Sequence, residues 1–74
     1  MPKEVNEKTL KQIGDNFRKV REQKNLFQED VAKAAGISIT YYAGIERGEE
    51  NPTMAVFESL CKALKVKSSE ILPF

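Results

Sequence analysis

The sequence predicts an all-α fold, and three observations lead to that prediction. Apolar residues recur at helical spacings of three and four along most of the chain. Residues that favour helix starts, such as Ser38 and Thr53, and helix ends, such as Gly36 and Gly48, separate these stretches. No segment shows the sustained apolar–polar alternation of a half-buried strand. With 74 residues, the chain is expected to form one small domain.

The first predicted helix spans residues 9–24. Its apolar face consists of four residues at spacings of 3, 4 and 3, namely Leu10, Ile13, Phe17 and Val20. Asn25 follows, and asparagine tolerates the left-handed conformation in which many helices end. Residues 1–8 have little to bury, so we expect a polar N-terminal leader there and a folded domain over residues 9–74.

Two short helices are predicted next, over residues 28–35 and 39–47. Acidic residues occupy the first turn of the former, where the helix dipole favours anions. Gly36 follows the last residue of that helix, and Ser38 is suited to cap the next one. The residues of the segment 39–47 expected to face the core are Tyr42 and Ile45.

The C-terminal third of the sequence predicts one longer helix and one last turn. The helix spans residues 54–64 and is capped by Thr53. Its apolar stripe contains Val56 or Phe57, together with Leu60, Cys61 and Leu64. The last turn is predicted over residues 68–72, which brings the expected number of helices to five.

The stretch around Gly36 favours a helix-turn-helix unit. Glycine permits a positive φ at the turn, Ile37 can anchor the turn in the core, and the small Ala32 lets two helices cross closely. In such a unit the second helix enters the major groove of DNA by its N-terminal end. The segment that begins at Ser38 is therefore predicted to face a DNA duplex.

Several stretches resemble a known family, in its order and spacing. They are residues 26–38 (LFQEDVAKAAGIS), 45–53 (IERGEENPT) and 60–66 (LCKALKV), followed by 69–72 (SEIL). Over about residues 13–72 the chain resembles the Cro/phage-repressor-like (XRE) helix-turn-helix family. Residues 40–48 (TYYAGIERG) also resemble the controller proteins of restriction–modification systems. The resemblance implies a five-helix, lambda-repressor-like DNA-binding domain that acts as a homodimer in transcriptional control.

The resemblance also implies which residues contact DNA: Gln28, Ser38, Ile39, Thr40, Tyr41, Ala43, Gly44, Arg47 and Asn51. Thr40 can hydrogen-bond a base or touch a thymine methyl group, whereas Ile39 can make apolar contact only. For Tyr41, phosphate contact and simple packing both stay open. For Gly44, close approach to DNA and relief of crowding both stay open.

Two further expectations concern structure rather than DNA contact. The resemblance pairs Arg21 with Glu46 in a structural ion pair. Relatives usually cap the second helix with Ser or Thr, so Phe27 at that position must either pack or leave the helix start frayed.

The dimer surface is expected at the C-terminal end, from Leu64, Val66, Ile71, Leu72 and Phe74. For Phe74, folding back on its own core is the alternative. A symmetric dimer would place two recognition helices about 34–36 Å apart on a palindromic site.

The charge distribution opposes tight DNA binding. Residues 28–55 carry two basic and five acidic side chains, a net charge of −3. Because DNA affinity depends largely on neutralised phosphates, we expect weak non-specific binding with a shallow salt dependence. The acidic segment also motivates an alternative function, a protein-interaction or antitoxin-type helix-turn-helix module with weak DNA binding.

Composition argues against several other functions. The chain has no histidine, which removes His-based acid–base catalysis and His-containing metal sites. We therefore expect no enzyme, metal or cofactor, and the lack of a long apolar run predicts no membrane segment. The single cysteine, Cys61, is expected to be a small buried hydrophobe in a reducing compartment. These points favour a cytoplasmic protein, and the resemblance implies one of a bacterium or phage, associated with the nucleoid.

Overall fold

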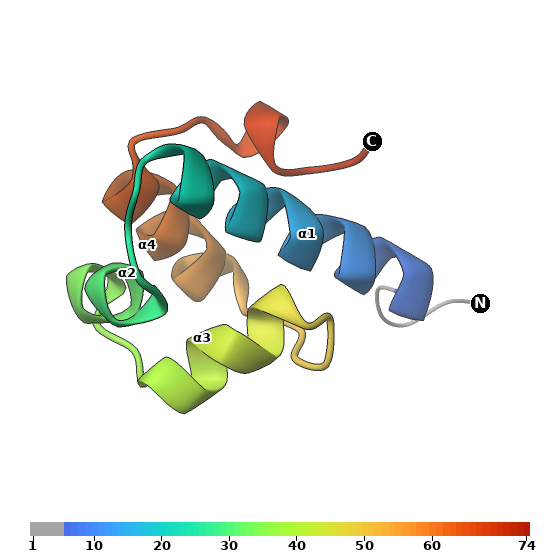
Figure 1. Cartoon of the computed structure of the whole chain (residues 1–74). Coiled ribbons are helices and arrows are strands. Elements are labelled where there is room, and N and C mark those ends of the chain that lie inside the picture. The colour runs from blue at the N-terminus through green and yellow to red at the C-terminus, as the bar shows by residue number, and fades with distance from the viewer. Residues whose placement is uncertain (1–5) are drawn as a thin grey trace.

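The computed structural model describes residues 6–74, which form four α-helices followed by a short 3-10 helix (Figure 1). The elements are α1 (Glu7–Gln23), α2 (Gln28–Ala35), α3 (Ile39–Glu46), α4 (Met54–Leu64) and η1 (Ser68–Glu70). No strand occurs within residues 6–74, so the all-α prediction is confirmed. The count of five α-helices is not supported, because the last segment is a single 3-10 turn. Ile71 turns into the core directly after it and Pro73 follows, which leaves no room for a longer helix.

The four α-helices pack around one core. The helix α1 packs against α3, and α2 packs against both α3 and α4. In Figure 1 the C-terminal segment with η1 lies on the side of α1 that faces away from α3. A hydrogen bond from Asn16 Nδ2 to the Ile71 carbonyl oxygen, 2.8 Å long, holds that segment against α1. The helix α1 is thus sandwiched between α3 and the C-terminal segment.

The core contains the apolar residues that the helical spacings predict. Its buried members are Ile13, Phe17, Val31, Ala32, Tyr42, Ile45, Phe57, Leu60, Cys61, Leu64 and Ile71. The rings of Phe17 and Phe57 meet edge-on with centroids 5.4 Å apart. Cys61 is a free, buried cysteine, and burial together with the nearby charge of Glu70 raises the pKa of its thiol. This environment fits a packing role for Cys61.

Side-chain caps set where three of the helices begin. Asn6 Oδ1 accepts a hydrogen bond from the backbone N–H of Thr9, so α1 begins at Glu7 rather than at Thr9 as expected. Residues 7 and 8 of the leader predicted over residues 1–8 therefore belong to α1. Residues 1–5 lie outside the described residues. Ser38 caps α3 and Thr53 caps α4, as the sequence predicts.

The start of α2 is stabilised in a way that neither alternative for Phe27 anticipated. The Phe27 side chain does not pack, because 76% of its surface is exposed. Instead Asp30, three residues later, accepts a hydrogen bond from the Phe27 backbone N–H at 2.7 Å. Asp30 thus makes one of the two hydrogen bonds of a capping box, the one to the backbone N–H of the capping residue. Its charge lies where the helix dipole favours an anion.

Candidate nucleic-acid interface

The turn between α2 and α3 fixes the two helices relative to each other. Gly36 ends α2 with φ +76°, a left-handed conformation that glycine adopts without strain. The backbone N–H of Ile37 donates to the Ala32 carbonyl at 3.0 Å, and the Ser38 side chain accepts from the Tyr41 N–H at 3.0 Å. These bonds close both helix ends at the turn, so α3 starts at a defined angle to α2.

One side of α3 is anchored in the core while its first turn is exposed. Tyr42, Ile45 and Glu46 are buried, and their side chains fix this side of α3 to the rest of the fold. On the other side Ile39 is 46% exposed and Thr40 is exposed. The structure therefore places the expected base-reading residues at the surface of the molecule.

Tyr41 and Ala43 border this exposed turn. Tyr41 is half-buried and packs against the edge of the core, which favours the packing interpretation of its ring. Ala43 is half-buried one turn after Ile39, on the same face of α3. Ala43 therefore extends the surface of the first turn without adding a polar group.

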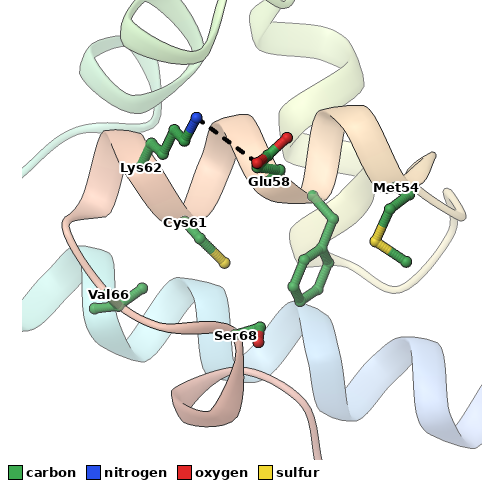
Figure 2. Close-up of a pocket in the computed structure, with 7 residues that line it drawn as sticks. Met54, Glu58, Cys61, Lys62, Val66 and Ser68 are labelled. Atoms are coloured by element: carbon green, nitrogen blue, oxygen red, sulfur yellow. Dashed lines mark ion pairs between the residues drawn. The ribbon is translucent and has the colours of Figure 1, made fainter.

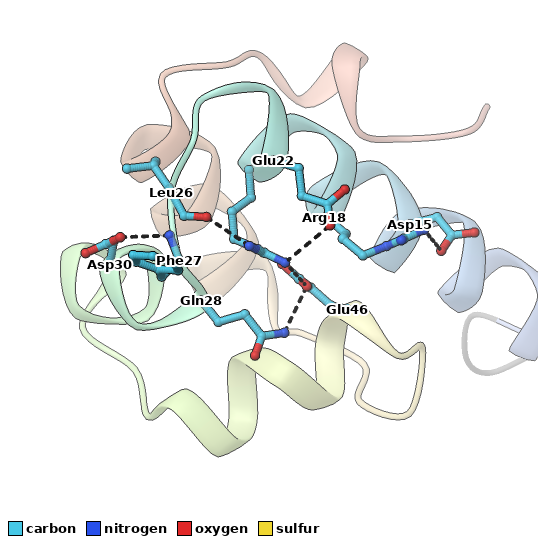
Figure 3. Close-up of polar contacts among 9 residues, drawn as sticks. Asp15, Arg18, Glu22, Leu26, Phe27, Gln28, Asp30 and Glu46 are labelled. Atoms are coloured by element: carbon cyan, nitrogen blue, oxygen red, sulfur yellow. Dashed lines mark hydrogen bonds and ion pairs between the residues drawn. The ribbon is translucent and has the colours of Figure 1, made fainter.

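A buried ion pair fixes α3 to α1. Arg21 Nε donates to Glu46 Oε2 at 2.7 Å and Arg21 Nη2 to Glu46 Oε1 at 3.1 Å, so the two residues that the resemblance pairs are in contact (Figure 3). The side chain of Glu46 is 3% exposed. Gln28 Nε2, from the first residue of α2, also donates to Glu46 Oε1, at 3.0 Å. The ion pair therefore joins α1, α2 and α3.

The electrostatics of Glu46 follow from this arrangement. Burial alone would raise the pKa of its carboxyl group, but hydrogen bonds from Arg21 and Gln28, together with the nearby Tyr42 hydroxyl, outweigh burial and lower it. Burial, and then the adjacent Glu46 carboxylate, raise the pKa of Tyr42. The Tyr42 hydroxyl oxygen is buried next to Glu46 without a hydrogen bond of good geometry to the described part of the chain. Glu46 stays charged and Tyr42 stays neutral at neutral pH.

Gln28 has a hydrogen-bond partner within the protein. Its side-chain nitrogen is bound to Glu46, and the residue is half-buried. The sequence does not reveal this partner because Gln28 and Glu46 are 18 positions apart and no local pattern joins them. In the first turn of α2 the Asp30 N–H donates to the Phe27 carbonyl at 3.0 Å, so the open backbone N–H groups are those at the very start of the helix, which have no partner within it.

At the C-terminal end of α3, the structure favours one of the two alternatives left open for Gly44. Gly44 is buried, and a Cβ atom there would lie 2.7 Å from Cγ of Glu50. The glycine therefore accommodates the Glu50 side chain and offers no exposed surface of its own, which favours relief of crowding. Arg47 is exposed and Nε donates to Glu49 Oε1 at 3.0 Å. Asn51 is exposed in the loop that follows.

The expected dimer residues fall into two groups. Leu64 and Ile71 are fully buried in the core of their own chain, so their assignment to a dimer surface is wrong. Apolar spacing marked them, but the same spacing fits burial within one chain. Val66 and Leu72 are half-buried, and Phe74 is 86% exposed, which rules out the alternative that its ring folds back on the core.

Two adjoining grooves lie beside these residues. One, of about 440 Å³, is lined by Met54, Phe57, Glu58, Cys61, Lys62, Val66 and Ser68 (Figure 2). The other, of about 420 Å³, also contacts Met54 and Phe57 and extends to Leu72 and Phe74. Met54, which is 82% exposed, was missed in the sequence because it lies outside the buried stripe of its helix. None of the lining residues comes from α3.

Two other kinds of site are absent from the part of the chain that the structure describes. Residues 6–74 contain no group of three or more His, Cys, Asp or Glu side chains placed to hold a metal ion. Within the same residues, no helix has the length and apolar character needed to span a membrane.

Comparison with known proteins agrees with this geometry. Residues 17–71 match the helix-turn-helix family HTH_3. The HTH-type transcriptional regulator y4dJ of Sinorhizobium fredii is 39% identical over 62 residues, which are 84% of this chain and 80% of that protein. Control protein C.SmaI of Serratia marcescens is 35% identical over 60 residues, which are 81% of this chain and 71% of that protein.

Solved structures show the same likeness. The restriction–modification controller protein C.AhdI from Aeromonas hydrophila superposes with a TM-score of 0.83 at 32% identity, covering 85% of this chain and 96% of that one. The controller protein C.Esp1396I, solved as a tetramer in complex with its natural 35 base-pair operator, gives a TM-score of 0.77 at 33% identity. That match covers 82% of this chain and 80% of the controller protein. The resemblance to XRE-type regulators and controller proteins is confirmed.

Proposed function

Because this chain belongs to the helix-turn-helix family HTH_3, we propose that it is a sequence-specific DNA-binding transcriptional regulator that acts as a homodimer. The observation that carries the proposal is the exposed first turn of α3, Ile39 and Thr40, on a helix whose other side is anchored in the core. It works on bacterial or phage DNA in the cytoplasm, at the nucleoid, without enzymatic activity or a cofactor.

In this proposal α3 enters the major groove by its N-terminal end. Thr40 contacts a base edge with its hydroxyl or methyl group, and Ile39 makes apolar contact beside it. The open backbone N–H groups at the start of α2 bind a phosphate, because a helix N-terminus attracts anions. Gln28 holds that N-terminus in place through Glu46, which makes it a positioning residue.

The local charge is less unfavourable for DNA than the count of five acidic residues suggests. Glu46 is neutralised by Arg21, which comes from outside the segment 28–55. Asp30 accepts a hydrogen bond from the backbone of Phe27 but keeps its charge, and the Glu49–Arg47 ion pair is already contained in the net charge of −3. Counting Arg21 with Glu46 brings the local charge to −2, which reduces the repulsion of DNA phosphates without removing it.

The proposed dimer surface contains the exposed Met54 and Phe74 and the two grooves between them. Burying large apolar side chains on association is favourable, and small domains often gain stability by pairing. Since α3 lines neither groove, pairing at this surface leaves both copies of α3 free to face one duplex.

The test is a selection of bound sites from a random duplex library, followed by fluorescence anisotropy on the selected duplex at low salt. We expect binding that falls with salt, and Thr40→Ala should change the sequence preference while its circular dichroism stays that of the parent chain. Gln12→Ala, at an exposed position of α1, is the control and should leave the preference unchanged. If no duplex binds, including the promoter of the protein's own gene, the regulator function is rejected in favour of the protein-interaction module.

A further inference from the structure

The exposed face of α3 has an unusual chemistry for a surface that reads bases. Between Ile39 and Glu46 the helix carries one charged residue, Glu46, and its side chain is buried against Arg21. The outward surface of the first turn includes the Ile39 side chain and Thr40, with Ala43 one turn further on. With the capping Ser38 and the half-buried Tyr41 beside them, it presents alkyl groups and hydroxyls, and no amide or guanidinium group.

Such a surface can distinguish few features of the major groove. Purines and unmodified cytosine present hydrogen-bond donors and acceptors there, and their strong readout needs Arg, Lys, Asn, Gln or a carboxylate. The apolar feature of the major groove is the methyl group on C5 of thymine. Methylation of cytosine at C5 places the same group at the same position of the pyrimidine ring.

We propose that Ile39, supported by the methyl groups of Thr40 and Ala43, reads the C5-methyl groups of pyrimidines in the major groove. The favoured site then has thymine opposite Ile39, and 5-methylcytosine is accepted where unmethylated cytosine is not. This inference rests on the proposed function and specifies which DNA that function recognises.

Arg47, an exposed cation at the end of this helix, is placed to contribute less. It caps the C-terminal end of α3, whereas helix-turn-helix units read bases with the N-terminal residues of that helix. Its Nε is bound to Glu49 at 3.0 Å, so a guanine would have to compete with that carboxylate for the guanidinium group. The discrimination at the first turn therefore depends on alkyl contact.

The experiment compares forms of one selected duplex in two pairs, thymine against deoxyuridine and 5-methylcytosine against cytosine, and the members of each pair differ only by a methyl group. Replacing thymine with deoxyuridine removes the C5-methyl group and keeps the hydrogen-bonding groups. Burial of one methyl-sized group corresponds to about a fourfold change in affinity, so each thymine in contact should cost about fourfold when replaced. At the same position, cytosine should bind weakly and 5-methylcytosine should restore the affinity.

Two variants connect the effect to Ile39. Ile39→Ala should bind the thymine and deoxyuridine duplexes with nearly equal affinity. Phe27→Ala, which removes an exposed apolar side chain outside α3, should keep the full discrimination of the parent chain. Comparing the ratio of affinities between variants cancels any effect of deoxyuridine on the shape of the duplex.

Three results would overturn the inference. If the parent chain binds thymine and deoxyuridine duplexes equally well, methyl readout is wrong while the proposed regulator function stands. If Ile39→Ala discriminates as strongly as the parent, the role of Ile39 is wrong. If no duplex of any composition binds, both the inference and the proposed function are rejected.

Discussion

The side chain of Arg21 joins three parts of the fold through its contact with Glu46. Two of its nitrogens donate to the Glu46 carboxylate at 2.7 and 3.1 Å, and a third, Nη1, donates to the Leu26 carbonyl at 2.9 Å. Because Glu46 ends α3 and Leu26 lies between α1 and α2, one guanidinium group fixes the helix-turn-helix unit onto α1. These contacts fix the position of α3 relative to α1, although the side chains of Arg21 and Glu46 do not lie on the exposed face of α3.

Arg21→Met should destabilise the fold strongly, because it leaves the Glu46 carboxylate buried without its partner. Breaking one side of a buried ion pair costs about 3–5 kcal/mol in the free energy of unfolding. The double variant Arg21→Met with Glu46→Leu should recover most of that loss, since it removes both charges. Urea denaturation followed by circular dichroism measures both values. A loss below about 1 kcal/mol in the single variant would show that water screens the pair.

Stability should also fall in acid because of Glu46. Its pKa in the folded chain is lowered by Arg21, Tyr42 and Gln28 relative to the ordinary value of 4.5, against the opposing effect of burial. The stabilisation is therefore fully present above pH 4.5 and is lost as the pH falls through the lower value of the folded state. Denaturation measured between pH 7 and pH 3 should show this decline. The double variant Arg21→Met with Glu46→Leu should show a flatter profile over that range, and an unchanged slope would contradict the assignment to Glu46.

Gly14→Ala should lower stability even though alanine favours helices more than glycine does. A Cβ atom at Gly14 would lie 2.4 Å from the Ile45 carbonyl oxygen and 2.5 Å from that of Glu46. Backbone atoms cannot move aside as a flexible side chain can, so α1 and α3 would be forced apart. Overpacking of this kind costs about 1–3 kcal/mol against a gain in helix propensity of about 1 kcal/mol, so the expected net loss is up to about 2 kcal/mol. Gln12→Ala on the exposed face is the control, and thermal unfolding distinguishes the two.

The two exposed phenylalanines provide a matched test of the dimer surface. Phe74 lines a groove beside Met54, whereas Phe27 lies at the start of α2. Sedimentation of the parent chain at micromolar concentration should give a mass near twice 8.4 kDa. Phe74→Ser should shift the distribution towards the monomer, and Phe27→Ser should not. Equal effects of the two variants, or a parent chain that stays monomeric, would reject this surface.

Glu49→Gln should strengthen DNA binding, because it frees Arg47 from its ion pair and removes a charge that repels phosphate. If Arg47 then contacts one phosphate, the slope of log affinity against log salt concentration should steepen by about 1 unit. Stability should change by less than about 1 kcal/mol, since the pair is exposed. Glu58→Gln, which frees Lys62 from a similar exposed pair on α4, is the control. A similar gain in that control would indicate a general charge effect.

The sequence predicts most of the fold because its helices depend on local patterns. Apolar spacing identified the buried faces, and Ser38, Thr53 and Gly36 marked helix ends that the structure confirms. The start of α1 was missed by two residues, because the cap is Asn6 and no apolar residue lies between it and Leu10 to mark the first turn of the helix. The final turn was expected as a helix because single turns leave too short a pattern to tell the 3-10 form from the α form.

The site was harder to predict because its contacts join residues far apart in sequence. Ile39 and Thr40 were expected at the surface, and they are exposed. The engagement of Gln28 by Glu46 and the covering of Gly44 by Glu50 arise from tertiary packing. The apolar character of Leu64 and Ile71 was evident, but spacing alone does not reveal whether such residues pack within one chain or against a second copy.

The C-terminal segment has a mechanical consequence through α1. Asn16 donates a hydrogen bond to the carbonyl of Ile71 on one side of that helix. Gly14, two residues earlier, packs closely against the backbone carbonyls of α3 on another side. Removing Ile71 together with the residues after it would take away a buried core side chain and this hydrogen bond. We expect such a truncation to weaken the packing of α1, and through α1 the support of α3.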